Sequence, residues 1–210
     1  MVAAASGAGD GATLYLVPLN QQGIRYESIK TIDPSMNHAN VIMEGAAAEQ
    51  LGEEGAGWGL LEHILDRAAV LYAWEQLGGA ETCLAMAKDH AMQRYAFGRP
   101  IGSFQAIKHK LATMYVKNTL ARSNAYYGAW ALNTDAAELP LAAATARVGS
   151  TQAYYFAAKE SIQTHGGMGF TWELDCHFYY RRSKVLAVTI GSERVWSDKL
   201  IKAADQATSS

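Results

Sequence analysis

The sequence predicts a mainly α-helical protein, with a C-terminal bundle of four to five helices preceded by part of an antiparallel β-domain. Two observations support this fold class. Short runs of strand-forming residues, separated by turn residues, occupy roughly the first fifty positions. From Gly57 onward, apolar residues instead recur every three or four positions over long stretches. We therefore expect a partial β-domain over residues 1–55 and a helical bundle domain over residues 56–210.

Three short strands are predicted in the first domain. The run from Thr13 to Val17 is rich in strand-forming residues and ends at Pro18. Residues 24–29 alternate between apolar and polar side chains, and residues 40–43 form a third short apolar run. Three strands are too few for a complete sheet with a covered face, so we expect only part of a β-domain.

The helical periodicity changes phase at clear breaks, which separate the expected helices. These cover about residues 57–95, 104–132 and 141–164, then a shorter helix from near Trp172, and a last helix over 185–204 with an interruption at Gly191. The connections are short and contain glycine, proline or asparagine. Long helices with short connections favour antiparallel packing in a bundle.

Composition narrows the class of protein. Hydrophobic residues make up 50% of the chain and charged residues 18%, which is typical of a protein with a substantial core. The net charge of −2 gives no electrostatic support for binding nucleic acid, and no apolar run is long enough to predict a membrane span.

The cysteines and the N-terminus indicate the cellular compartment. Cys83 and Cys176 lie far apart, match no metal-ligand spacing, and are interpreted as buried reduced thiols. Residues 1–12 are rich in alanine and glycine, and they lack the features of a signal peptide. We expect a cytoplasmic protein, or one of an organellar matrix.

The first segment with residues suited to ligand binding runs from Arg94 to Ile101, with Gln105 just beyond it. It places a guanidinium, aromatic rings and an amide at the corner between two predicted helices. Such an arginine can hold phosphate oxygens through two parallel hydrogen bonds. The same pattern also fits an ordinary helix end, where a cation complements the helix dipole.

The second segment, residues 163–173, contains three glycines among the four residues 166–169. Glycines let a backbone approach a ligand closely, and exposed amides at a turn can hold an anion. A plain interhelical turn is the alternative interpretation. The histidines offer no catalytic pattern, and we interpret each as a core or surface residue; those considered are His63, His90, His109, His165 and His177.

Together the two segments resemble the acyl-CoA dehydrogenase family. RYAFGRPIGSFQAIKHKLATM is similar to the family's Arg-x-x-Phe-Gly stretch with its following Gln-Ala-Ile helix. QTHGGMGFTWELDCHFYYRR is similar to the Gln-x-x-Gly-Gly-x-Gly-Phe-Thr segment. LYLVPLNQQGI resembles a strand and turn of the family's β-domain, and GEEGAGWGLLEHILDRA resembles the entry to its first C-terminal helix.

The resemblance implies a flavin-dependent removal of two hydrogens from the α and β carbons of an acyl-CoA substrate. It also implies FAD bound between subunits of a homo- or hetero-oligomer, and electron-transfer flavoprotein as a partner. By motif position, Arg94 would pair with the FAD diphosphate, Phe97 would line the adenine side, and Gln105 would lie nearby.

Gln163, Gly166 and Gly167 would approach the adenosine–diphosphate part of the cofactor from the other subunit, again by motif position. A diphosphate needs a fixed cationic fork and exposed backbone amides, which is consistent with this assignment.

The residue expected to remove the α proton is missing at both positions where the family carries it. One position precedes a glycine near the last helix, where this chain has Ile190. The other lies two residues after an aspartate that resembles Asp66, where this chain has Ala68. Glu75 and Glu193 are nearby carboxylates at neither position. No catalytic residue is therefore assigned, and the chain alone is expected to be inactive.

Three interpretations remain open. The chain can be a stretch of an ordinary acyl-CoA dehydrogenase polypeptide. It can be the base-lacking subunit of a heteromeric enzyme, resembling those that act on steroid side chains, an interpretation that Ile190 and Ala68 favour. It can also be a non-catalytic helical assembly subunit without flavin.

Overall fold

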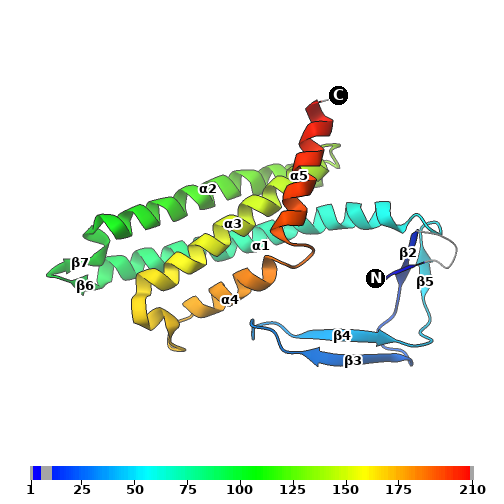
Figure 1. Ribbon diagram of the computed structural model, residues 1–210, viewed down its shortest axis with the longest axis horizontal. Helices are drawn as coiled ribbons and strands as arrows, with labels where there is room; N and C mark the ends of the chain where they lie inside the picture. The colour runs from blue at the N-terminus through cyan, green and yellow to red at the C-terminus, as the bar shows by residue number, and fades with distance from the viewer. Residues whose placement is uncertain (1, 6–10, 209–210) are drawn as a thin grey trace. The chain divides into compact units, whose positions relative to one another are not determined.

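The computed structural model describes residues 2–5 and 11–208, and Figure 1 shows its elements in chain order. The expected fold class is confirmed, because short antiparallel strands precede five α-helices in the described part of the chain. The chain divides into two compact units, residues 1–65 and residues 66–210, and each is described by itself. Residues 6–10, in the alanine- and glycine-rich segment, lie outside the described residues.

The first unit contains a three-stranded antiparallel sheet in the order β1-β2-β5. Its strands are β1 (Val2–Ala5), β2 (Ala12–Leu16) and β5 (Glu49–Leu51). Only β2 carries a strong strand signal, and its Leu14 is fully buried. The other two strands are short and consist mostly of alanine (β1) or of polar residues (β5), which have low strand propensity, so their pairing with β2 makes them strands.

The same unit contains an antiparallel pair formed by β3 (Ile24–Ile29) and β4 (His38–Met43). The register places Ile24 opposite Met43 and Tyr26 opposite Val41. Both members of the second pair are exposed apolar residues within this chain. A pair of strands with uncovered apolar side chains fits the expectation of a partial β-domain.

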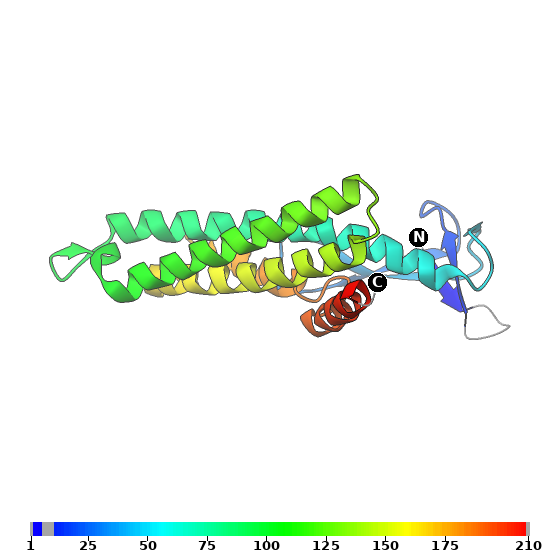
Figure 2. The same ribbon diagram turned by 90° about the horizontal axis from the view of Figure 1, so that it is seen from above.

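The second unit is built on long helices. Helix α1 (Gly57–Gln93) begins in the first unit and continues into the second. The others are α2 (Gln105–Asn133), α3 (Leu139–His165), α4 (Cys176–Leu186) and α5 (Glu193–Thr208). Helix α3 packs against α2, α4 and α5, and Figures 1 and 2 both show α2 and α3 lying side by side.

The last two helices differ from the expected ones. The helix expected from near Trp172 begins at Cys176, after a turn. The stretch expected as one interrupted helix divides into the end of α4 and the separate helix α5. Ile190 and Gly191 cause the division, because their φ angles of 57° and 112° are incompatible with a right-handed helix.

Small side chains let the helices of the bundle approach closely. Helix α3 buries seven alanines: Ala142, Ala143, Ala144, Ala146, Ala153, Ala157 and Ala158. Gly79 of α1 lies against the ring of Tyr154 of α3, so close that a Cβ at this glycine would be 2.4 Å from the ring. Larger residues, including Met114, Tyr154 and Leu186, fill the space between the alanines.

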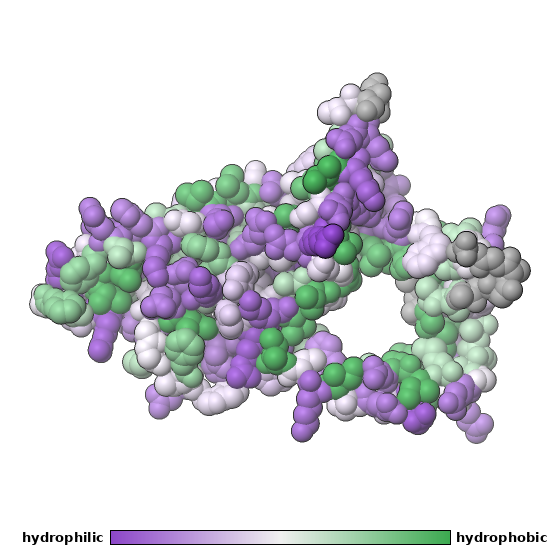
Figure 3. Space-filling model, viewed as in Figure 1, coloured by the Kyte–Doolittle hydropathy of each residue, from purple (hydrophilic) through white to green (hydrophobic). Residues whose placement is uncertain are grey.

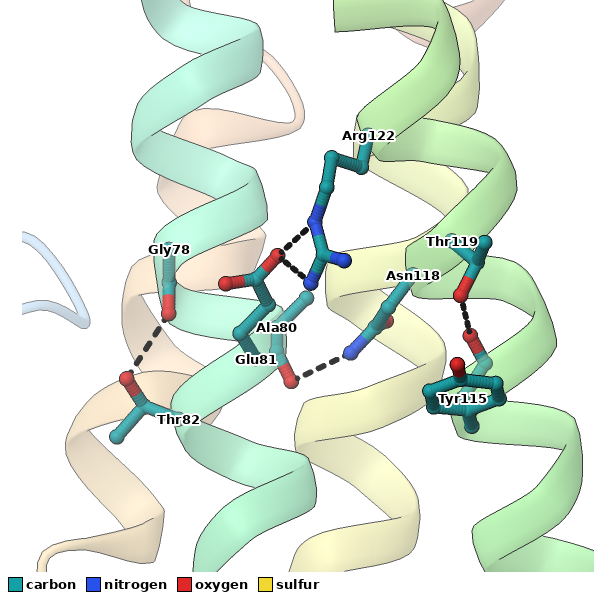
Figure 4. A network of polar contacts seen from close by, with 8 residues as sticks. All are labelled: Gly78, Ala80, Glu81, Thr82, Tyr115, Asn118, Thr119 and Arg122. Atoms are coloured by element: carbon teal, nitrogen blue, oxygen red, sulfur yellow. Dashed lines mark hydrogen bonds and ion pairs between the residues drawn. The ribbon is translucent and has the colours of Figure 1, made fainter.

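Polar contacts fix α2 against α1 (Figure 4). The Asn118 amide is 2% exposed and donates a hydrogen bond of 2.9 Å to the backbone carbonyl of Ala80. One turn further along, Arg122 donates from Nε and Nη2 to Glu81 at 2.8 and 2.5 Å. The ion pair is partly exposed and screened by solvent, so the buried Asn118 bond sets the register of the two helices.

Candidate functional site

A strained hairpin connects α1 to α2. Strands β6 (Tyr95–Ala96) and β7 (Arg99–Pro100) pair around the two-residue turn formed by Phe97 and Gly98. Both turn residues have positive φ, 53° and 78°, as a type I′ turn requires. For phenylalanine this conformation costs about 1 kcal/mol. The ring is nevertheless 95% exposed, so packing within the chain does not account for a phenylalanine at this position.

The Arg94 side chain projects from the same corner. Its backbone N–H donates to the carbonyl of His90, and its carbonyl accepts from Ile101, each at 2.8 Å. These bonds fix the backbone, while the guanidinium is exposed and contacts no carboxylate among the described residues. The guanidinium is therefore available to an external anion.

Aromatic packing supports the hairpin on the start of α2. The Arg99 guanidinium lies 4.0 Å from the centre of the Phe104 ring. The Phe97 ring meets Phe104 edge-on, with centroids 6.1 Å apart. Gln105 follows as the first residue of α2, and its side chain is exposed. Figure 3 shows apolar residues gathered at this end of the molecule, with hydrophilic residues beside them.

The second predicted segment forms the end of α3 and the short helix η2 (Gly166–Phe170). Gly166 has a φ of 63° and donates its N–H to the carbonyls of Ile162 and Gln163, which caps α3. A Cβ at Gly166 or Gly167 would meet no atom within 4 Å, whereas one at Gly169 would be 2.6 Å from the Ile162 carbonyl. The first two glycines therefore leave an open backbone surface, and the third is required for packing.

A pair of histidines brings these two segments together. His90, in the last turn of α1, and His165, the last residue of α3, have ring centroids 4.4 Å apart with a 33° tilt. Arg94 follows His90 by one helical turn, and Gly166 follows His165 directly. The structure thus places the predicted Arg94 corner and the predicted glycine bend at the same end of the bundle. All six residues predicted to bind the cofactor are exposed there: Arg94, Phe97, Gln105, Gln163, Gly166 and Gly167.

Sequence reasoning did not single out this histidine pair. His165 is 8% exposed, and its Nδ1 lies 2.8 Å from the Ser161 carbonyl oxygen. Because a carbonyl only accepts, Nδ1 carries the proton. The available signal was positional, since each histidine stands next to one of the two motifs. Only the fold shows that the two rings stack.

Ile190 lies in a well-ordered turn between α4 and α5. Its carbonyl accepts a hydrogen bond of 3.1 Å from the indole N–H of the buried Trp196. On the α3 side of the turn, the guanidinium of Arg147 donates hydrogen bonds to the carbonyls of Leu186 and Thr189, the latter at 2.8 Å. These contacts hold Ile190 at its left-handed φ of 57°.

Arg147 was also missed from the sequence. It is 1% exposed, and a third hydrogen bond of 2.7 Å reaches the Gln76 side chain. Burial lowers the pKa of Arg147 to about 10, so the guanidinium stays protonated at neutral pH. Its position among alanines on the buried face of α3 is the sequence signal that could have identified it.

The carboxylates near the two empty base positions are engaged by other side chains. Asp66 is buried and lies 2.6 Å from the ammonium group of Lys199. Glu75 accepts hydrogen bonds of 2.7 and 3.1 Å from Arg182. Glu193 accepts a bond of 2.7 Å from the Gln152 amide. Each of these carboxylates is engaged by a neighbouring side chain, so none is the unpaired carboxylate in a dry pocket that a general base requires.

Two further features of the described residues concern metal sites and membrane spans. The described residues contain no cluster of histidine, cysteine or acidic side chains suited to a metal ion. Within residues 2–5 and 11–208, no helix combines the length and the apolar character needed to cross a bilayer. A pocket of about 400 Å³ lies beside the Ile190 turn, and its polar lining includes Lys117, Tyr155 and Lys184.

Comparison with known proteins places these features in a family. The family model described as "Acyl-CoA dehydrogenase, C-terminal domain" matches residues 55–204. Acyl-CoA dehydrogenase IpdE2 of Mycobacterium tuberculosis is 46% identical over 133 residues, which cover 62% of this chain and 39% of that protein. The human mitochondrial short-chain specific acyl-CoA dehydrogenase is 28% identical over 190 residues, covering 88% of this chain and 46% of the relative.

Solved structures agree with the sequence comparison. Butyryl-CoA dehydrogenase from Megasphaera elsdenii superposes with a TM-score of 0.88 at 25% identity, covering 92% of this chain and 52% of the other. The Tcur3481-Tcur3483 steroid ACAD superposes with a TM-score of 0.85 at 26% identity, over 96% of this chain and 54% of the other. The chain spans less than half the length of the two curated relatives named above.

Proposed function

Because the chain belongs to the acyl-CoA dehydrogenase family, we propose that it works within an FAD-dependent acyl-CoA dehydrogenase. In this proposal Arg94 and the Gly166–Gly167 bend of one chain, which lie at the same end of its bundle, together contribute one side of the site for the adenosine and diphosphate of FAD, instead of facing it from two subunits as the motif positions imply. The reaction removes hydrogens from the α and β carbons of an acyl-CoA thioester. The carboxylate base comes from a different part of the assembly, and the electrons leave through an electron-transfer flavoprotein.

The exposed Arg94 guanidinium is the observation that carries the proposal. An arginine without a carboxylate partner, at the same end of the bundle as an open, glycine-lined backbone, is a favourable site for a diphosphate, which accepts paired hydrogen bonds. Gly166 and Gly167 let a ligand approach where a Cβ would block it. Phe97 offers a flat apolar ring for the adenine.

The residues present therefore fit the nucleotide part of FAD. When bound, the flavin accepts the hydride that leaves the β carbon of the substrate. This chain's own part is to orient the cofactor: Arg94 binds phosphate charge, Gln105 and Gln163 offer amide hydrogen bonds, and Phe97 covers the adenine. A site this open excludes water only when a second protein surface closes it.

The proposal assigns no proton transfer to this chain. Isoleucine at position 190 and alanine at position 68 cannot accept a proton, and the neighbouring carboxylates are paired. Arg147 and Trp196 nevertheless hold the turn at residue 190 in a defined conformation. A base-lacking subunit beside a catalytic subunit accounts for both facts. The names of the Tcur3481-Tcur3483 and ChsE4-ChsE5 proteins each join two components among structures with this fold, and the second is called a complex.

A second candidate function is assembly without flavin. Helix α2 exposes a stripe of large apolar residues that suits contact with another helix: Tyr115, Val116, Leu120, Tyr126 and Trp130. Flavin content of the assembled protein separates the two candidates, because the assembly role needs none.

The test is to express the chain together with a candidate dehydrogenase partner and to measure flavin absorbance per purified complex. We expect a yellow complex that loses most of its flavin with Arg94→Ala. Arg122→Ala is the matched control, because it removes a guanidinium from α2 that pairs with Glu81. A stable colourless complex would support the assembly role, and a yellow Arg94→Ala complex would refute the phosphate assignment.

The missing base can be tested in the same complex. Ile190→Glu places a carboxylate on a turn whose backbone is already fixed by Arg147. We expect this variant to gain measurable turnover of an acyl-CoA at its own site, whereas Ile190→Gln, of similar shape but without a base, gains none.

A further inference from the structure

The stacked pair His90–His165 has no role in the function proposed above, yet it lies where the two predicted segments meet. The centroids are 4.4 Å apart, so the rings are in contact. Two positively charged imidazoles at this separation repel each other strongly, whereas one charged and one neutral ring do not. The state in which both imidazoles carry a positive charge is therefore disfavoured unless negative charge is supplied nearby.

The surroundings of the pair already disfavour additional positive charge. Burial, then His165 and then Arg94 lower the pKa of His90. On α4, the thiol of Cys176 lies 3.5 Å from His165 Nδ1, and burial raises the pKa of that thiol, so it stays neutral. The nearest acidic residue on α3, Glu160, is paired with Lys110 of α2 at 2.8 Å and with Lys159 at 3.7 Å.

The remaining acidic residues near the pair are exposed, so solvent screens their charge. Asp89, which precedes His90, lies 3.6 Å from the ammonium of Lys88 and is exposed. Asp175 precedes Cys176 and is exposed. Compensating negative charge for the pair must therefore come chiefly from a ligand.

We propose that the His90–His165 pair takes up a proton when a diphosphate diester binds between Arg94 and the Gly166–Gly167 bend, so that binding is tighter in mildly acidic solution. The inference rests on the proposed function, because it needs a diphosphate at this corner. His90 and His165 then act as binding residues that neither motif includes.

The reasoning follows from linkage. A bound anion stabilises the charged form of a nearby imidazole, which raises its pKa in the complex above its value in the free protein. A group whose pKa rises on binding strengthens that binding at pH values below the higher pKa, and the gain disappears as the pH rises through it. For histidine this window lies near neutrality.

FAD itself is the appropriate probe. Its diphosphate is esterified at both ends, so each phosphate keeps a single strongly acidic group, the charge is constant across the neutral range, and any pH dependence comes from the protein. The complex of the chain with its dehydrogenase partner, freed of flavin, is titrated with FAD near pH 8 and near pH 6, with calorimetry in two buffers of different ionisation enthalpy to count protons. We expect the dissociation constant to fall by about three- to tenfold at the lower pH, with net proton uptake.

Three variants localise the effect. His90→Gln and His165→Gln are expected to abolish most of the pH dependence, whereas His109→Gln, an exposed position on α2, should keep it. Because His165 is buried, His90→Gln provides the decisive variant should His165→Gln not fold. The ring proton resonances of His90 should also report a higher pKa in the FAD complex than in the free protein.

The outcomes separate this inference from the function beneath it. If FAD binds through Arg94 but with the same pH dependence in His90→Gln as in the wild type, the histidine proposal is wrong and the proposed function stands. If FAD does not bind, or binds equally well to Arg94→Ala, the proposed site is wrong and the histidine proposal fails with it.

Discussion

Adjacent glycines at positions 78 and 79 of α1 provide a sharp test of how the bundle is packed. A Cβ at Gly79 would lie 2.4 to 2.7 Å from three atoms of the Tyr154 side chain. Tyr154 is 2% exposed and belongs to a core cluster with Ala80, Cys83 and Met114. Its ring cannot move away without disturbing that cluster. We predict that Gly79→Ala destabilises the protein.

The magnitude follows from two opposing effects. Overpacking a well-filled core typically costs about 1–3 kcal/mol. Replacing a helical glycine with alanine returns about 0.5–1 kcal/mol through backbone entropy. The net prediction for Gly79→Ala is a loss of about 1–2 kcal/mol in the free energy of unfolding. At Gly78, where a Cβ meets no atom within 4 Å, only the favourable effect remains, so Gly78→Ala should stabilise by about 0.5–1 kcal/mol.

The assay is chemical denaturation followed by circular dichroism, with both variants and the wild type measured under identical conditions. The sign of the difference between the two variants is the result that matters, because both carry the same substitution in the same helix. Equal stabilisation by both substitutions would show that α1 does not approach Tyr154 closely, and it would refute the packing described here.

Three further predictions concern the site and the cysteines. Arg147→Met should lower the free energy of unfolding by about 3 kcal/mol or more, because the Gln76 side chain and the carbonyls of Leu186 and Thr189 lose a charged donor. Denaturation experiments measure this loss, and an unchanged midpoint would contradict the role of Arg147. Phe97→Asn should raise stability by about 0.5–1 kcal/mol, since asparagine tolerates a φ of 53°, while weakening FAD binding in a fluorescence titration; unaltered affinity would remove Phe97 from the site. Cys83 and Cys176 should resist a thiol reagent near pH 8 until denaturant is added, because burial raises the pKa of both thiols; rapid labelling of the native chain would be the contrary result.

The sequence predicted the elements whose signal is local. The long helices have a clear periodicity, and glycine or proline marks their ends, so the expected bounds of α1, α2 and α3 agree closely with those observed. The strands β1 and β5 were not predicted, because their residues become strands only by pairing with β2. Secondary structure that depends on a distant partner leaves little trace in the local pattern.

The candidate site likewise contains residues that local motifs identify and contacts that only the fold reveals. Arg94 and Gly166 were singled out because their motifs are contiguous in sequence, and their roles in cofactor binding remain predictions. The His90–His165 stack joins residues 75 positions apart in the sequence. It forms because α1 and α3 end at the same end of the bundle. Arg147 contacts a turn some forty residues away. Such contacts follow from how the helices pack, and helical periodicity alone does not specify that packing.

The central claim, that FAD lies across this corner with its diphosphate beside Arg94 and the glycine bend, can be tested through the phosphorus nuclei of the cofactor. A nitroxide attached to Met168→Cys, an exposed position next to the glycine bend and outside the residues assigned to bind FAD, should broaden both phosphorus resonances of bound FAD, whereas one attached to Ala137→Cys should leave them sharp. The 27 residues of α3 separate the two labels by about 40 Å. The native cysteines are buried, so the label attaches to the introduced thiol. Equal sharpness with both labels, or broadening only with the label at position 137, would contradict the claim.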